Sequence, residues 1–180
     1  MNRRQALTAG ASFAVAMVPG RNAGAGSVTQ GATGRSSVVG AWRLLSIATV
    51  RPNGEEVTDW AGPKPTGILI YAADGYMSVQ VVRDPPARWS YSAPEQASVG
   101  ERARAFDRYY GYFGRFAVDL ARGVVTHFID GSLQPNEVGL TYERQLRLDG
   151  DRLLLTATPF TFNGEQRFNR LVWQRVAPPA

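Results

Sequence analysis

Three tight turns, each between two β-rich runs, constrain the fold of this chain more than any other feature. The first is Ala73-Asp74-Gly75, and Asp-Gly between two such runs is a strong hairpin signal. Ala121–Gly123 and Asp149–Asp151 are the second and third. A hairpin joins neighbouring antiparallel strands. The body of the chain is therefore predicted to be an antiparallel sheet.

The turns divide the chain from residue 38 onward into eight predicted strands. Eight antiparallel strands can form a sandwich or close into a barrel. The interior of an eight-stranded barrel is either filled by side chains or holds one small ligand. The predicted strands are Val38–Val50, Thr66–Ala72, Tyr76–Arg83, Phe113–Leu120, Val124–Asp130, Leu140–Leu148, Arg152–Thr158 and Arg167–Val176.

One segment departs from the strand pattern. Residues 94–110 are rich in Glu, Gln, Ala and Arg, which favour helix. Ala97, Phe106 and Tyr110 belong to an imperfect apolar stripe at helical spacing. We expect one helix inserted near residues 94–110, lying beside or over the sheet.

The first 25 residues have the three-part pattern of an export signal. Arg3 and Arg4 precede an apolar run from Ala6 to Val18, and the small residues Ala23–Ala25 suit a cleavage site. The run has 13 residues, too few to span a bilayer, which takes about 20 helical residues. Paired arginines followed by Leu7 are typical of twin-arginine export, and an ordinary secretory signal or a plain tail are the alternatives.

The domain organisation follows from this signal. We expect the signal to be cleaved after Ala25, and residues 26–37, rich in Gly, Ser and Thr, to form a flexible linker. One domain over residues 38–177 then remains, with no membrane span in the mature chain. Its expected location is the periplasm or outside of a bacterial cell, because twin-arginine export is a bacterial route.

Composition excludes several kinds of site. The 180 residues include no cysteine and one histidine, His127, so disulfides, thiolate metal sites and multi-histidine zinc sites are not expected. Without Arg3, Arg4 and Arg21 the basic residues fall from 20 to 17 against 15 acidic ones, and they are scattered. A nucleic-acid partner would favour a basic cluster. We expect no metal, no cofactor and no nucleic acid, and the pattern favours no particular oligomeric state.

Tryptophans stand near both ends of the predicted sheet. Gly40-Ala41-Trp42 opens the first strand, and Trp173-Gln174-Arg175 lies on the last. A tryptophan can plug one end of a barrel while a guanidinium stacks on its face. Other motifs follow the same order: Val38–Leu44, Pro65–Tyr71, Asp74–Ser78, Tyr112–Phe116, Val125–Phe128, Pro135–Gly139 and Leu171–Arg175.

Together these motifs resemble the bacterial and fungal lipocalin-like domain family over about residues 38–176. The resemblance implies a closed barrel with a ligand cavity, and a structural role for Trp42, Trp173 and Arg175. It implies no single activity, because a fold does not fix a function. The family usually carries an aromatic residue where Glu137 stands.

Arg144 lies among apolar residues in the strand pattern. Alternation over residues 140–148 places it on the face of Leu140, Tyr142 and Leu146. A buried arginine needs a carboxylate or several acceptors. Arg144 is therefore a candidate for binding an anion or a carbonyl group. A structural ion pair, or a position at the barrel mouth, are the alternatives.

His127 and the tyrosines are the other candidate site residues. His127 shares a face with Val125 and Ile129 and can be an acid, a base, a hydrogen-bond donor to a ligand, or a satisfied core residue. A buried tyrosine needs a partner, which a ligand can provide. Tyr76 and Ser78 share one face of their strand, and a polar cavity would turn that face inward. The ligand-binding candidates are Tyr71, Tyr76, Ser78, His127, Tyr142 and Arg144; the catalytic candidates are His127 and Arg144.

Three functions fit these residues. The first is an exported barrel that binds a small apolar or aromatic molecule. The second is a cofactor-independent isomerase, cyclase or lyase in which His127, Arg144 and a tyrosine act on such a molecule. The third is an envelope interaction protein whose barrel is filled. The presence and lining of a cavity distinguish the three.

The predicted cleavage site can be read directly from the exported protein. Cleavage after Ala25 makes Gly26 the first residue of the mature chain. N-terminal sequencing of protein recovered outside the cytoplasm checks this, and an intact Met1 would contradict it.

Overall fold

The computed structural model describes residues 36–57, 61–84, 89 and 93–177. The predicted signal over residues 1–25 lies outside this part, as does most of the predicted linker. The described residues form ten strands: β1 (Gly40–Val50), β2 (Glu56–Val57), β3 (Thr66–Tyr71), β4 (Tyr76–Val82), β5 (Tyr109–Asp119), β6 (Val124–Ser132), β7 (Thr141–Asp149), β8 (Arg152–Ala157), β9 (Phe160–Phe162) and β10 (Glu165–Arg175).

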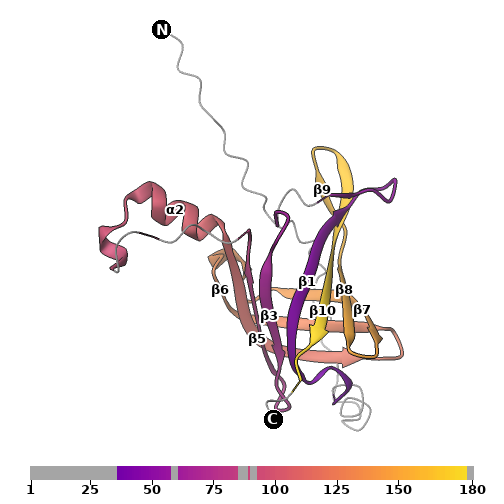
Figure 1. Cartoon of the computed structure of the whole chain (residues 1–180). Coiled ribbons are helices and arrows are strands. Elements are labelled where there is room, and N and C mark those ends of the chain that lie inside the picture. Colours follow the sequence, from indigo (N-terminus) through magenta and orange to yellow (C-terminus); the bar gives the residue numbers. More distant parts are fainter. Residues whose placement is uncertain (1–35, 58–60, 85–88, 90–92, 178–180) are drawn as a thin grey trace.

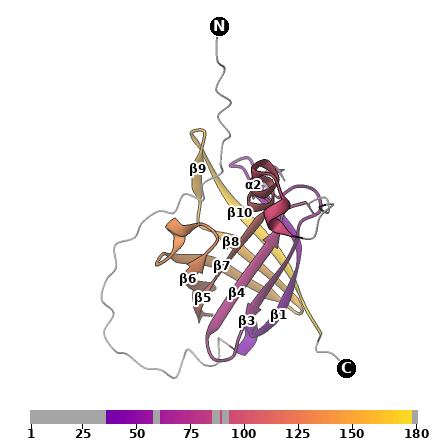
Figure 2. The same ribbon diagram turned by 90° about the vertical axis from the view of Figure 1, so that its left-hand side faces the viewer.

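Eight of these strands close into an antiparallel barrel. The order around it is β1-β3-β4-β5-β6-β7-β8-β10, and β10 pairs back onto β1. Figures 1 and 2 show the strands wrapping around one interior. The eight-stranded lipocalin-like barrel expected from the sequence is confirmed, because a sandwich would leave β1 and β10 unpaired. The short strands β2 and β9 extend β1 and β10 beyond one end.

The two ends of the barrel differ. At the Trp42 end, where β1 begins, tight hairpins join β3 to β4, β5 to β6 and β7 to β8. At the opposite end, here called the α2 end, lie β2, β9, the helix α2 (Val99–Asp107) and the 3₁₀ turn η2 (Pro135–Glu137). The long connections, and hence the access to the interior, belong to the α2 end.

The helix is shorter than the predicted segment of residues 94–110. Ser98 and Glu101 form a capping box, with the Ser98 amide donating to Glu101 Oε2 at 2.9 Å, so the helix begins after Ser98. Tyr109 and Tyr110 pair with Val82 and Val81 of β4 and belong to β5. No residue of α2 is buried, and Figure 1 shows it projecting from the barrel. Among the described residues, no helix is long and apolar enough to cross a membrane.

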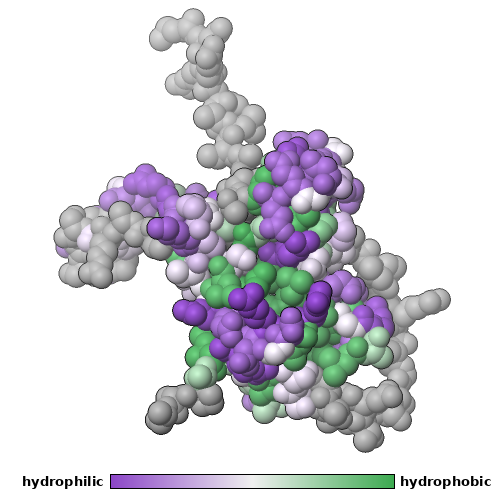
Figure 3. Space-filling view, turned by 45° about the vertical axis from the view of Figure 1, so that its right-hand side comes forward, coloured by the Kyte–Doolittle hydropathy of each residue, from purple (hydrophilic) through white to green (hydrophobic). Residues whose placement is uncertain are grey.

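The outer surface of the barrel carries apolar as well as polar side chains. Figure 3 shows hydrophobic residues gathered between hydrophilic regions on one face. On β3, Ile68 and Ile70 are exposed, whereas Leu69 and Tyr71 are buried. A strand that is apolar on both faces does not reveal its inner face through polarity alone.

Trp42 fills the end of the barrel at which β1 begins. It is fully buried, and its indole N–H donates to the Val38 carbonyl at 2.8 Å. The Arg175 guanidinium stacks on its ring, with Cζ 4.1 Å from the ring centroid. Arg175 also donates to the carbonyls of Val39 and Ser37, both at 2.8 Å. One arginine therefore ties the segment before β1, which includes Ser37 at the end of the predicted linker, to the last strand.

Replacing Trp42 tests this end of the fold. Trp42→Ala should lower the free energy of unfolding by about 3–5 kcal/mol, because a large buried aromatic leaves a cavity. Tyr76→Ala is the matched control, since Tyr76 is 57% exposed on the outer face and its loss should cost less than about 0.5 kcal/mol. Urea unfolding of both variants measures the difference, and equal costs would contradict the plug.

Candidate functional site

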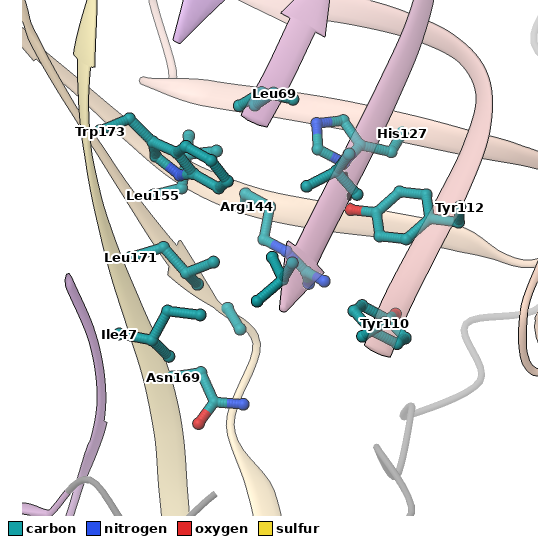
Figure 4. A pocket seen from close by; sticks show the side chains of 13 residues that line it. Ile47, Leu69, Tyr110, Tyr112, His127, Arg144, Leu155, Asn169, Leu171 and Trp173 are labelled. Atoms are coloured by element: carbon teal, nitrogen blue, oxygen red, sulfur yellow. Dashed lines mark hydrogen bonds between the residues drawn. The ribbon is translucent and has the colours of Figure 1, made fainter. Parts of the chain in front are cut away.

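A cavity occupies the barrel between its middle and the α2 end. All eight barrel strands contribute to its wall, because inward side chains alternate with outward ones along each strand. The volume open to the centre of a water-sized sphere is about 50 Å³, whereas one water needs about 10–15 Å³ on this measure. The cavity therefore has room for a few water molecules in the absence of a ligand. Its lining residues are Ile47, Leu69, Val79, Val81, Tyr110, Tyr112, His127, Arg144, Leu155, Ala157, Asn169, Leu171 and Trp173 (Figure 4).

His127 lies between two tyrosine hydroxyls. Its Nε2 is 2.7 Å from Tyr71 Oη, and its Nδ1 is 2.8 Å from Tyr112 Oη. A neutral imidazole has one donor and one acceptor nitrogen. One tyrosine therefore donates to His127 and the other accepts from it, and the accepting tyrosine keeps its own proton for another partner. Of these three residues, Tyr112 and His127 line the cavity, and Tyr71 lies behind them.

Burial sets the protonation states of these groups. It lowers the pKa of His127 to about 3, with help from the positive charge of Arg144. Burial also raises the pKa of Tyr71 and of Tyr112, although the Arg144 guanidinium opposes this at both hydroxyls. At neutral pH the imidazole and both phenols are therefore uncharged, and the Tyr71–His127–Tyr112 group is a chain of neutral hydrogen bonds.

Arg144 enters the cavity from β7. Its guanidinium carbon lies 4.8 Å from the centroid of the Tyr142 ring, and Nη1 donates to the Glu143 carbonyl at 3.3 Å. None of the ion pairs formed by the described residues includes Arg144. The structural ion pair considered for this residue is therefore absent from the described part of the chain, and a positive charge faces the cavity.

A buried carboxylate lies at the α2 end, beside the cavity. Glu137 of η2 is 4% exposed and accepts from the Tyr110 hydroxyl, at 3.1 Å to each oxygen, and from Ser132 Oγ at 2.7 Å. Burial and the neighbouring Glu137 carboxylate raise the pKa of Tyr142. Glu137 thus anchors η2 to the barrel wall through Tyr110.

The structure separates the candidate residues predicted from the sequence. His127 and Arg144 line the cavity, and Tyr71 and Tyr142 are buried next to it. Tyr76 and Ser78 are a correction. They lie on the outer face of β4, because the apolar side chains of Met77, Val79 and Val81 occupy the inner face.

Several cavity residues escaped the sequence interpretation. Tyr110 and Tyr112 lie on the inner face of β5 together with Phe116, but the predicted strand began only at Phe113. Alternation continued backward from Phe116 would have found both tyrosines. Trp173, given a structural role together with Trp42 and Arg175, also lines the cavity, as does Asn169.

The burial of His127 makes the stability of the barrel depend on pH. Between pH 6.5, the ordinary pKa of histidine, and about pH 3, the unfolded chain binds a proton that the folded chain does not. The free energy of unfolding should therefore decrease as the pH is lowered. This residue should contribute a decrease of about 2 kcal/mol between pH 7 and pH 5. His127→Gln keeps a donor and an acceptor between the tyrosines but does not titrate. Urea unfolding should show a shallower fall for this variant, and identical pH profiles would contradict the assignment.

Comparison with known proteins gives two findings that agree with the barrel. The family model described as "Lipocalin-like domain" matches residues 39–176. The "4'-hydroxy-3'-methoxypropiophenone carrier protein ppsC" of Aspergillus oryzae is 33% identical over 109 residues, which cover 56% of this chain and 96% of that protein. No solved structure gives a significant match. The match over most of the barrel, with the eight-stranded fold, shows that this chain belongs to the lipocalin-like domain family.

Proposed function

We propose that this protein is an exported carrier that holds a small aromatic molecule inside its barrel. The observation that carries the proposal is the cavity itself, which is walled mainly by aliphatic and aromatic side chains and has a few polar groups. Ligand sites of this kind bind apolar bodies and use the polar groups for orientation. A filled barrel, the third function considered above, would have no such space.

The fungal relative supports an aromatic ligand. Its name describes a carrier of an aryl ketone that has one ring, one hydroxyl and one methoxy group. A ring of this size needs more space than the present volume of about 50 Å³, because a cavity of about 150 Å³ holds benzene, so binding would have to widen the wall at Leu69, Val79 and Leu155. Export is supported by the pattern of residues 1–25, which would place the carrier in the periplasm or outside a bacterial cell.

The Tyr71–His127–Tyr112 chain also raises a second candidate, a cofactor-independent enzyme. Both nitrogens of His127 are engaged by tyrosines, so the imidazole has no free nitrogen for a ligand. Only Tyr112 could pass a proton between this chain and the cavity, and burial raises its pKa, which makes it a weak acid. The geometry therefore favours binding over catalysis.

Binding inside the barrel can be tested with 4'-hydroxy-3'-methoxypropiophenone as a probe. The probe should quench the fluorescence of Trp173, which lines the cavity. Ala157→Leu adds bulk to the cavity wall and should weaken binding about tenfold or more, equivalent to about 1.4 kcal/mol. Ala117→Leu is the matched control, because Ala117 is exposed on the outer face of β5, and it should bind like the wild type.

Two results of this titration would contradict the carrier. Equal loss of affinity in both variants would place the probe outside the barrel. Recovery of a chemically altered probe after incubation would favour the enzyme, because a carrier returns its ligand unchanged.

A further inference from the structure

The polar groups that face the cavity are mainly hydrogen-bond donors. A guanidinium and an indole N–H can only donate. Trp173 Nε1 is buried and has no hydrogen-bond partner. Thr49 donates to Asn169 Oδ1 at 3.0 Å, which leaves the Asn169 amide nitrogen turned toward the cavity (Figure 4). Arg144 and Asn169 thus present N–H groups from two strands to the same space, which the Trp173 ring also lines.

The charge in the cavity is also one-sided. Arg144 has no carboxylate at ion-pair distance among the described residues, and the oxygens of Glu137 are held by Tyr110 and Ser132. The histidine and the tyrosines around it are uncharged at neutral pH, because burial lowers the pKa of the histidine and raises the pKa of the tyrosines. They are Tyr71 on β3, Tyr110 and Tyr112 on β5, His127 on β6 and Tyr142 on β7.

A partly buried cation without a counterion is costly, and a bound anion would remove that cost. We propose that the cavity takes its aromatic ligand as an oxygen anion, with the charged oxygen on the Arg144 guanidinium and any further oxygen of the ligand accepting from Asn169. This inference rests on the proposed binding function and adds the charge state of the ligand. A phenolate and a carboxylate share the required chemistry, since both place negative oxygen against a planar guanidinium.

Three single-ring probes separate the possibilities. The first, 4'-hydroxy-3'-methoxypropiophenone, is a phenol that ionises, and its phenolate absorbs at longer wavelength than its neutral form. The second, 3',4'-dimethoxypropiophenone, has nearly the same shape and cannot ionise. The third, 3,4-dimethoxybenzoate, is an anion at all pH values used. Absorbance titration gives the pKa of the bound phenol, and fluorescence titration gives all three affinities.

The wild type should lower the pKa of the bound phenol by about one unit or more, as a nearby arginine does for other acids. The Arg144→Gln variant should leave the pKa of the bound phenol unchanged. Its loss of affinity should be about tenfold larger for 3,4-dimethoxybenzoate than for 3',4'-dimethoxypropiophenone. Arg144→Lys should retain most of the effect, because it keeps the charge. Arg147→Gln, on the outer face of the same strand, is the matched control and should behave like the wild type.

Each outcome decides a different question. If Arg144→Gln weakens binding of the phenol probe alone, the ligand is a phenolate. If it weakens binding of 3,4-dimethoxybenzoate alone, the ligand is a carboxylate. The inference would be overturned if all three probes bind, the pKa of the bound phenol is unchanged, and Arg144→Gln loses the same affinity for each probe. The proposed carrier function would then still hold. Failure of every probe to bind would count against the proposed function itself, and against the inference that rests on it.

Discussion

The pairing of the first strand with the last is the interaction on which the rest of the structure depends. Trp42 lies opposite Arg175 in this ladder, and the Arg175 guanidinium covers the Trp42 ring. Closing so long a loop of chain has an entropic cost, which the ladder and the stacking offset. Closure also leaves the eight barrel strands without a free edge, which is where sheets otherwise aggregate. The enclosed interior exists only because β1 and β10 remain paired.

The enclosure determines the chemistry of the cavity. The same removal of water that lowers the pKa of His127 raises the pKa of Tyr71 and Tyr112, so all three become neutral hydrogen-bonding groups. An arginine guanidinium stays charged under such conditions. Its charge in turn helps to keep the imidazole neutral. The closure of the barrel therefore determines the protonation states of these side chains and the positive charge that remains in the cavity.

Much of the fold could be predicted from the sequence, because hairpin turns are local signals. The three hairpin turns predicted which strands are neighbours, and the resemblance carried by motifs such as Gly40–Trp42 and Trp173–Arg175 implied the closure of the barrel. The helix boundaries were less accurate, since Tyr109 and Tyr110 look helical by spacing and are drawn into β5 by pairing with β4. Pairing across a sheet is a tertiary effect that spacing along the chain does not contain.

The candidate site was only partly predictable, for a related reason. Alternation shows which residues share a face, but not which face is inside. On β7 the apolar face identified Arg144 as an inward residue, whereas on β4 the possibility of a polar cavity left Tyr76 and Ser78 as candidates. The side of the sheet that becomes the interior is fixed by packing against distant strands.

A closed barrel also limits how it can recognise a ligand. In the strands, main-chain N–H and C=O groups bond to neighbouring strands, so few remain to contact a molecule in the interior. Recognition must then come from side chains, and few of those on the cavity wall are polar. Because Arg144 and Asn169 both present N–H groups, the wall selects for ligand oxygen over ligand N–H or O–H. Replacing one of these donors by an acceptor would therefore change the class of ligand while leaving the barrel, which is held by other residues, intact.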